Sequence, residues 1–233
     1  MKRFLLFTLV LIQFNLSSQT WFEAGVKGGP AITFLTSNNV FDDSKYDHMI
    51  KPAYFFGGKL GVNFGEENGV SLQVGRTAIR QHFRNNYENR SFVERDFRAK
   101  VLDLGVLYHR TKDAGYFEIG PRMSLTQSAE MTDDNNTIND MTDELNSSYF
   151  GFDIGFGSFF MGNERLTLMT GFRLSYGISP IMSDDRHLGP IEASYTTANN
   201  VHLASAMFCL ELNYSLGYLV RSNCGRRTTW LSF

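Results

Sequence analysis

The sequence predicts an all-β protein, an eight-stranded antiparallel up-and-down transmembrane β-barrel. Three observations predict it: an export signal at the start of the chain, eight segments in which apolar and polar residues alternate, and connections that are long and short in turn. The 233 residues include 21 phenylalanines and 21 glycines but only five prolines. This composition suits tightly packed strands that present aromatic rings on one face.

The N-terminal segment has the layout of a secretory signal peptide. Lys2 and Arg3 precede an apolar run at 4–12, and small residues follow at 17–18. The mature chain is therefore expected to begin near Gln19. The apolar run is too short for a transmembrane helix, and no later stretch approaches the ~20 apolar residues that such a helix needs.

Eight segments show the period-two alternation of strands with one apolar face. They are expected at 21–35, 53–64, 69–83, 97–110, 115–128, 148–161, 165–179 and 201–219. In the first four, the alternating apolar residues are Phe22 and Val26; Tyr54, Phe56, Leu60 and Val62; Val70, Leu72 and Val74; and Leu102, Leu104, Val106 and Tyr108. In the last four they are Phe117, Ile119, Met123 and Leu125; Phe150, Phe152, Ile154 and Phe156; Leu166, Leu168, Phe172 and Leu174; and Phe208, Leu210, Leu212 and Tyr214. The third strand loses clean alternation near Arg76, where we expect a β-bulge.

The connections alternate in length, which is how up-and-down outer-membrane barrels are built. Long polar segments lie at 36–51, 84–96, 129–147 and 180–200. Short turns lie at 65–68, 111–114 and 162–164. All long loops then fall at the outer end, and both chain ends fall at the periplasmic end.

The chain is expected to hold one folded domain. We place the signal peptide at 1–18, the barrel at 19–220 and a periplasmic tail at 221–233. A net charge of −2 gives no basic excess, so nucleic acid is not expected as a partner. Cys209 and Cys224 do not form a disulfide framework, and we expect both to be unpaired.

A soluble lipocalin-like barrel has the same strand pattern as a membrane barrel. The two differ in which face of the strands, apolar or polar, points into the barrel. Seven mid-strand charges fall opposite the phenylalanine and leucine rows: Lys27, Lys59, Glu118, Arg122, Asp153, Arg173 and Glu211. Eight strands leave a lumen only just wide enough to fill with side chains, so the rings of the second and sixth strands would crowd it. We therefore expect the rings to face lipid.

The polar face then becomes the interior, where acids and bases neutralise each other. A salt-bridged plug is expected rather than a conducting pore, because water-filled channels need more strands. Six aromatic residues near the short-turn ends are expected to form a girdle at the membrane surface: Trp21, Phe64, Tyr108, Tyr116, Phe160 and Tyr218.

Four strand motifs resemble the PorT-like outer-membrane β-barrel domain family of Bacteroidota: Gly25-Val-Lys-Gly-Gly-Pro, Glu118-Ile-Gly-Pro-Arg, Gly151-Phe-Asp-Ile-Gly-Phe-Gly and Arg173-Leu-Ser-Tyr-Gly-Ile-Ser. The resemblance covers nearly the whole mature chain and implies an outer-membrane barrel. The family's namesake serves a protein-secretion system, whereas most members have no assigned biochemical role. The C-terminus departs from the family pattern, because Trp230-Leu-Ser-Phe233 adds a second aromatic end after the last strand.

No catalytic, cofactor-binding or metal-binding residue is expected. Asp184, Asp185 and His187 in the fourth long loop, with His48 in the first, are the candidates for a rim-site enzyme. No Gly-x-Ser-x-Gly or His-Glu-x-x-His motif accompanies them. The acidic loop 130–147 offers oxygen ligands, but it lacks the spacing of a Ca²⁺ loop and is expected to be solvated.

The expected function is a non-catalytic structural or binding role. The alternatives are a subunit of an outer-membrane protein-secretion system and a rim-site enzyme. Expected partners are outer-membrane lipid and lipopolysaccharide, the barrel-assembly machinery, and a protein met by the exposed loops or the periplasmic face. Arg98 and Lys100 lie on the outward side of the fourth strand, where they are placed to meet lipid phosphate.

Overall fold

Antiparallel strands form most of the described chain. A computed structural model describes residues 20–36, 46–65, 67–85, 93–133, 135–163, 165–182 and 200–218. Its elements are β1 (Thr20–Thr36), β2 (Tyr46–Ile50), β3 (Pro52–Phe64), β4 (Asn68–Asn85), β5 (Val93–Lys112), β6 (Gly115–Thr132), β7 (Ile138–Asp140), the 3-10 helix η1 (Thr142–Glu144), β8 (Ser148–Gly162), β9 (Leu166–Gly177) and β10 (His202–Tyr218). The predicted signal peptide and tail lie outside the described residues. Among those residues, no helix has the length and apolar character to cross a membrane.

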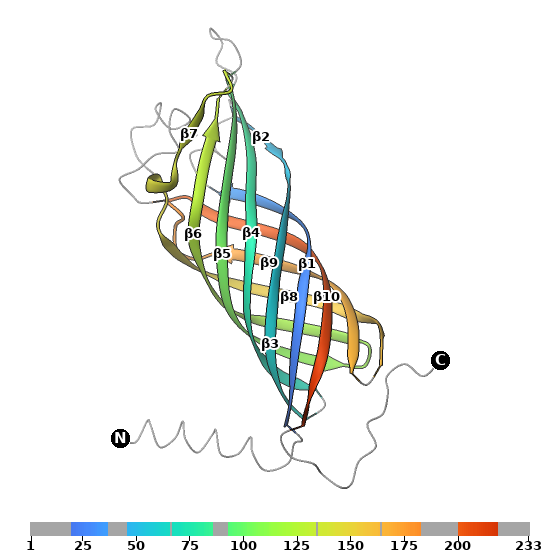
Figure 1. Cartoon of the computed structure of the whole chain (residues 1–233). Coiled ribbons are helices and arrows are strands. Elements are labelled where there is room, and N and C mark those ends of the chain that lie inside the picture. Colours follow the sequence, from blue (N-terminus) through green and yellow to red (C-terminus); the bar gives the residue numbers. More distant parts are fainter. Residues whose placement is uncertain are drawn as a thin grey trace, which may run out of the picture.

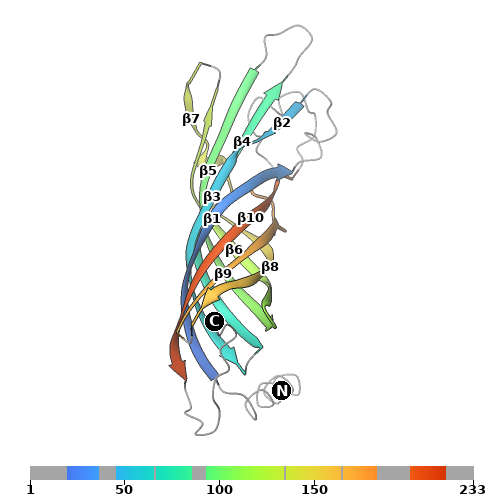
Figure 2. The same cartoon turned by 90° about the vertical axis from the view of Figure 1, so that its right-hand side faces the viewer.

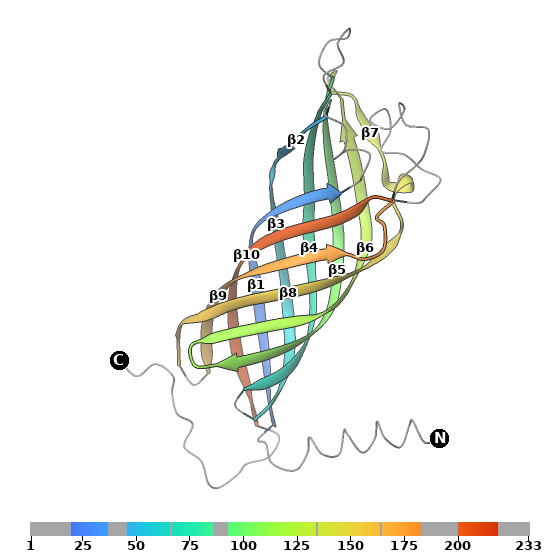
Figure 3. The same ribbon diagram turned by 180° about the vertical axis from the view of Figure 1, so that it is seen from behind.

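Eight of the strands close into a ring. Around the ring the order is β1, β3, β4, β5, β6, β8, β9 and β10, and every neighbouring pair is antiparallel. The first and last strands pair along most of their length, from Trp21 opposite Tyr218 to Thr36 opposite His202. The predicted eight-stranded barrel is therefore confirmed, and Figures 1 and 3 show it from opposite sides.

The two faces of the barrel wall are assigned as the alternation predicts. All seven charges predicted to share a face are buried inside the barrel. The phenylalanine and leucine rows point outward, and Phe56, Leu60 and Phe172 expose 65%, 60% and 53% of their surface. A water-soluble barrel would bury these rings and expose the charges, so the lipocalin-like alternative is wrong.

Tyr116 of the predicted aromatic girdle does not face lipid. Tyr116 is buried inside the barrel, where its ring lies over Gly157 of β8 and Gly171 of β9. A Cβ at either glycine would overlap the tyrosine, so only glycine fits at these two positions while Tyr116 keeps this place. The alternation of β6 places Tyr116 on the inner face with Glu118. The prediction considered only that Tyr116 is near a turn and ignored the face on which alternation places it. Tyr108 and Phe160 do face outward.

Strands β4, β5 and β6 are longer than a bilayer requires. They have 18, 20 and 18 residues, against the ~10 that cross the membrane at a tilt. In Figure 2 they continue beyond the level at which β1 ends. There β2 pairs with β4, and β7 pairs with β6. We call β2, β7 and these protruding parts of β4, β5 and β6 the extension.

The extension corrects two predicted loops. Segments 36–51 and 129–147 were expected to be loops, yet they contain β2 and β7. Both short strands hydrogen-bond to the protruding ends of β4 and β6, whose backbone groups would otherwise need other partners.

The pattern of apolar and polar residues on β4 reverses near Thr77, without a shift in strand register. Below Thr77 the inner residues are polar, as at Gln73, whereas beyond it Ile79 and Phe83 are apolar and flank the buried Gln81. Strand β4 nevertheless keeps one register with β5 from Asn68 to Asn85. The bulge expected near Arg76 is therefore absent from this pairing. On the outer face, apolar Leu72 and Val74 give way to charged Arg76 and Arg80 at this height, as is expected where lipid ends and water begins.

Candidate functional site

Charged side chains from seven strands meet in the short-turn half of the barrel interior. We call this set the lumen network, and its members are Glu23, Lys27, Lys59, Asp103, Glu118, Arg122, Asp153, Arg173 and Glu211. The network has four cations and five carboxylates, so its charges nearly cancel. Buried charges are tolerated only when they are paired in this way.

The pairs in the lumen network link nearby strands of the ring. Lys59 bridges Glu23, at 2.9 Å from Nζ to Oε1, and Glu211. Arg173 donates to Glu118, with 2.8 Å between Nε and Oε1. These bridges join β3 to β1 and β10, and β9 to β6. The network therefore connects strands that are direct or next neighbours in the ring.

Arg122 forms the second arginine node of the network. Its Nη1 lies 3.2 Å from Asp103 Oδ1, and its Nε lies 3.2 Å from Asp153 Oδ1. Asp103 also accepts a hydrogen bond from Thr77 at 2.6 Å. The four motifs behind the PorT-like resemblance supply Lys27, Glu118, Arg122, Asp153 and Arg173. Those motifs therefore specify how the interior is filled.

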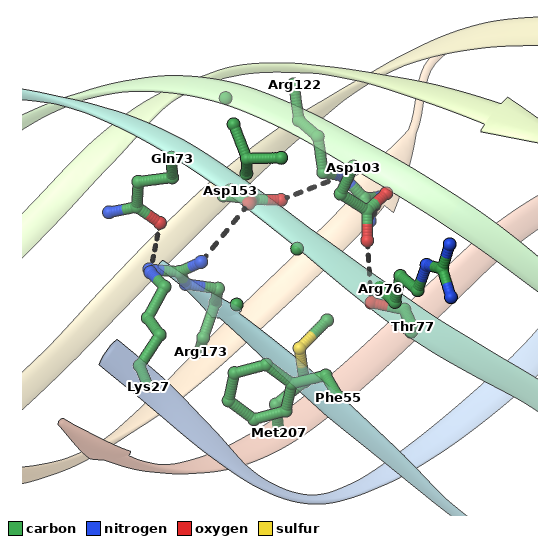
Figure 4. Close-up of a pocket in the computed structure, with 14 residues that line it drawn as sticks. Lys27, Phe55, Gln73, Arg76, Thr77, Asp103, Arg122, Asp153, Arg173 and Met207 are labelled. Carbon is green, nitrogen blue, oxygen red and sulfur yellow. Dashed lines mark hydrogen bonds and ion pairs between the residues drawn. The ribbon is translucent and has the colours of Figure 1, made fainter. Parts of the chain in front are cut away.

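The space left in the lumen network is small. Figure 4 shows Lys27, Gln73 and Arg173 around a cavity that Phe55 and Met207 also line. Its volume is about 30 Å³. One water needs roughly 10–15 Å³ by this measure, so the cavity has room for about two. Side chains fill the interior here, as the salt-bridged plug predicts.

The long-loop half of the interior is mostly apolar, which corrects the prediction of a polar lumen throughout. A cluster that we call the apolar plug fills it: Leu35, Ile79, Phe83, Phe97, Ala99, Val101, Ala129, Met131, Met141, Leu145, Tyr149, Ile181, Met182, Val201 and Leu203. Two loops close over its top, because the Asn146 N–H donates to the Ile181 carbonyl at 2.8 Å and Leu145 pairs with Met182.

The acidic loop is therefore partly buried, unlike the solvated loop that was predicted. Met141 and Leu145 enter the apolar plug. Two of the loop's carboxylates stabilise turns: Asp133 accepts from the Thr137 N–H at 2.9 Å, and Asp140 accepts from the Thr142 N–H at 2.9 Å. Among the described residues, no group of three or more histidine, cysteine or acidic side chains is placed to hold a metal ion.

The rim-site candidates fall mostly outside the described residues. Asp184, Asp185 and His187 lie there, as does Cys224. The backbone of His48 belongs to β2 and pairs with Phe83 of β4. Cys209 is buried with a free thiol. The two cations predicted to meet lipid phosphate, Arg98 and Lys100, are exposed on the outer face of β5.

An ion cluster that the sequence did not reveal lies on the outer face of the extension. Asp96 of β5 accepts hydrogen bonds from Lys51 Nζ at 2.5 and 2.7 Å and lies 2.7 Å from His82 Nδ1. Partial burial would raise the pKa of the Asp96 carboxyl, but the hydrogen bonds from Lys51 and His82 outweigh it. The pKa is held below its ordinary value, and the cluster ties the segment between β2 and β3 to β5.

Removing the Lys51 ammonium is expected to raise the pKa of Asp96. A depressed pKa adds stability that is complete above the unfolded value of about 3.9 and is lost as the pH falls through the folded value. Lys51→Met should therefore move the carboxyl titration of Asp96, followed by NMR in micelles, toward 3.9. Lys112→Met at the opposite end of β5 is the control and should leave that titration unchanged. An unshifted titration in Lys51→Met would refute the assignment.

A closed ring with an apolar outer surface and paired charges inside defines a transmembrane β-barrel. The chain belongs to the outer membrane protein beta-barrel domain family, whose model matches residues 16–183. The protein is therefore a component of the cell outer membrane. Because long loops of such barrels face outward, the extension is expected at the extracellular end.

Similar solved structures include three outer-membrane proteins. Neisserial surface protein A (NspA) is 14% identical, with a TM-score of 0.46 over 84% of this chain and 97% of that chain. OprG from Pseudomonas aeruginosa is 11% identical, with a TM-score of 0.42 over 85% and 97%. Ail from Yersinia pestis is 12% identical, with a TM-score of 0.39 over 82% and 98%. No curated protein matches the chain.

Proposed function

We propose that the protein is a non-catalytic outer-membrane barrel that binds a partner through its extension. The observation that carries this proposal is the extension itself, a five-stranded sheet that rises beyond the apolar band on its own apolar plug. Side chains fill the described interior, so the exterior of the extension is the surface available for recognition. A protrusion with a packed core also keeps its shape, which reduces the entropy cost of binding.

A photo-crosslinking residue placed on the extension tests this proposal in whole cells. Position 138 suits the probe, because Ile138 of β7 exposes 65% of its surface. We expect a discrete crosslinked product from position 138. The matched position is 112, where exposed Lys112 lies at the periplasmic end of β5. Folded protein that gives no product at position 138 would contradict binding through the extension.

A secretion-system subunit is the second candidate, favoured by the PorT-like motifs. Those motifs line the interior, so they support a shared architecture more directly than a shared role. A secretion subunit is expected to meet its partners at the periplasmic end. Products from position 112 but not from position 138, with copurification of the same partner from native membranes, would favour this candidate over the first.

A rim-site enzyme is the remaining alternative, and direct assays separate it from a binding role. We expect the purified barrel to hydrolyse neither lipid nor peptide substrates. If it does show an activity, the triple variant Asp184→Asn, Asp185→Asn and His187→Gln identifies its source. An activity that this variant abolishes would overturn the non-catalytic proposal.

A further inference from the structure

The outer face of the β4 and β5 pair changes character in three steps. From the periplasmic end upward, directly opposed outward residues are Val70 and Tyr108, Leu72 and Val106, Val74 and Leu104, Arg76 and Leu102, Ala78 and Lys100, Arg80 and Arg98, His82 and Asp96, and Arg84 and Glu94. The first three pairs are apolar and face lipid. The last two combine a base with an acid. The three between them hold four cations and no acid.

These four cations form what we call the basic patch: Arg76, Arg80, Arg98 and Lys100. All four are exposed. Arg76, Arg80 and Lys100 make no ion pair with any carboxylate of the described residues, and Arg98 only approaches Asp96, at 3.8 Å. Asp96 is already bound by Lys51 and His82. Within the described part of the chain, the positive charge of the patch therefore exceeds the negative charge beside it.

The register makes this charge costly without a counter-ion. Arg80 and Arg98 are direct cross-strand partners, and like charges in that position destabilise a sheet. On the other side of β5, Arg98 is opposite Glu130 of β6, whereas Lys100 is opposite Ser128. Among the described residues, two carboxylates, Glu130 and Asp96, therefore adjoin four cations, and both lie beside Arg98. An anion from outside the chain would offset the repulsion.

The height of the basic patch identifies that anion. Arg76 is opposite Phe56 of β3, which is 65% exposed in the lipid-facing band, and Lys100, opposite Ala78, lies two residue pairs higher. This is the level at which the hydrocarbon ends and the headgroups of the outer leaflet begin. We propose that the basic patch binds the phosphate groups of a phosphorylated lipid in the outer leaflet. The inference needs only the membrane placement and is independent of the proposed function.

The chemistry of the patch suits a phosphate. The arginine guanidinium presents paired donors that match phosphate oxygens, and the lysine ammonium adds a point charge. Arg98 and Lys100 are two residues apart on one strand face, a separation of roughly 6.6 Å, and Arg80 faces Arg98 across the strands. A headgroup with two phosphates could engage both levels of the patch.

Native mass spectrometry of the detergent-purified barrel tests the proposal, with diphosphorylated lipid A as the probe. The triple variant Arg80→Gln, Arg98→Gln and Lys100→Gln should bind about a hundredfold more weakly, since each cation near an anionic lipid surface contributes about fivefold. The control removes the same charge from exposed positions at the periplasmic end: Arg110→Gln, Lys112→Gln and Arg165→Gln. It should bind as the unaltered chain does.

Three results would overturn the proposal: equal losses in both triple variants, equal binding of dephosphorylated lipid A, or full displacement by millimolar inorganic phosphate, which would mark a site for free anions. Heat-modifiable gel migration reports whether each variant is folded. If the first triple variant does not fold, Lys100→Gln alone carries the test with an expected fivefold loss. Arg80→Lys with Arg98→Lys keeps the charge and should retain most of the binding.

Discussion

Arg173→Met is expected to destabilise the barrel by about 3–5 kcal/mol, because it leaves the buried Glu118 carboxylate without its arginine. Arg173 is 6% exposed, donates to Glu118, and also approaches Asp153 at 3.8 Å. Asp153 keeps Arg122 as a partner, but Glu118 loses its arginine. Urea unfolding in lipid vesicles, followed by tryptophan fluorescence, measures the loss.

Two further variants make this test specific to the ion pair. Adding Glu118→Gln to Arg173→Met removes the stranded charge and should recover part of the loss, with a coupling energy of roughly 0.5–3 kcal/mol. Arg165→Met, at an exposed position in a short turn, should change the stability by no more than about 0.5 kcal/mol. A loss below 1 kcal/mol in Arg173→Met would show that the lumen network is not what holds the barrel walls.

Phe97→Ala is expected to cost about 3–5 kcal/mol, the usual range when a fully buried phenylalanine is removed from a core. Phe97 of β5 is 1% exposed and lies in the apolar plug. The loss should appear first in the extension, because the lumen network below is untouched. Amide hydrogen exchange should therefore accelerate in β5, β6 and β7 more than in β9 and β10.

Ile138→Ala is the matched control for this prediction. Ile138 lies in the same extension but exposes 65% of its surface, so removal of its side chain should leave exchange in the extension nearly unchanged. If Phe97→Ala accelerated exchange equally in all strands, the extension would not be a separate unit of stability.

The barrel could be predicted from the sequence because lipid imposes one simple rule on every strand. Period-two alternation located all eight ring strands, and charges such as Lys59 and Asp153 identified the inner face. Loop alternation gave the order of the strands. Nothing beyond local pattern was needed, since each strand pairs with its sequence neighbour in the ring.

Strands longer than the ~10 residues that cross a bilayer were expected to project beyond it. The strands β2 and β7 and the apolar interior were missed, because the same rule stops where the lipid stops. In water an apolar residue belongs inside and a charge outside, so Ile79 and Arg80 reverse the pattern of Val74 and Gln73. The reversal was visible near Arg76 as a loss of alternation, and it was misread as a bulge. The partners of Asp96 could not be found at all, because Lys51 and His82 meet it only through pairing across three strands.

The reversal on β4 also fixes how deep the barrel sits in the membrane. Each residue pair along a strand spans roughly 3.4 Å, so sinking by a few ångströms would carry Arg76 into hydrocarbon. Rising by the same distance would bring Val74 into water. A cation on the lipid face costs up to ~2–4 kcal/mol at the midplane. The change from apolar to charged residues on the outer face therefore fixes the depth of the barrel. We expect a bilayer of unmatched thickness to stretch or thin around it.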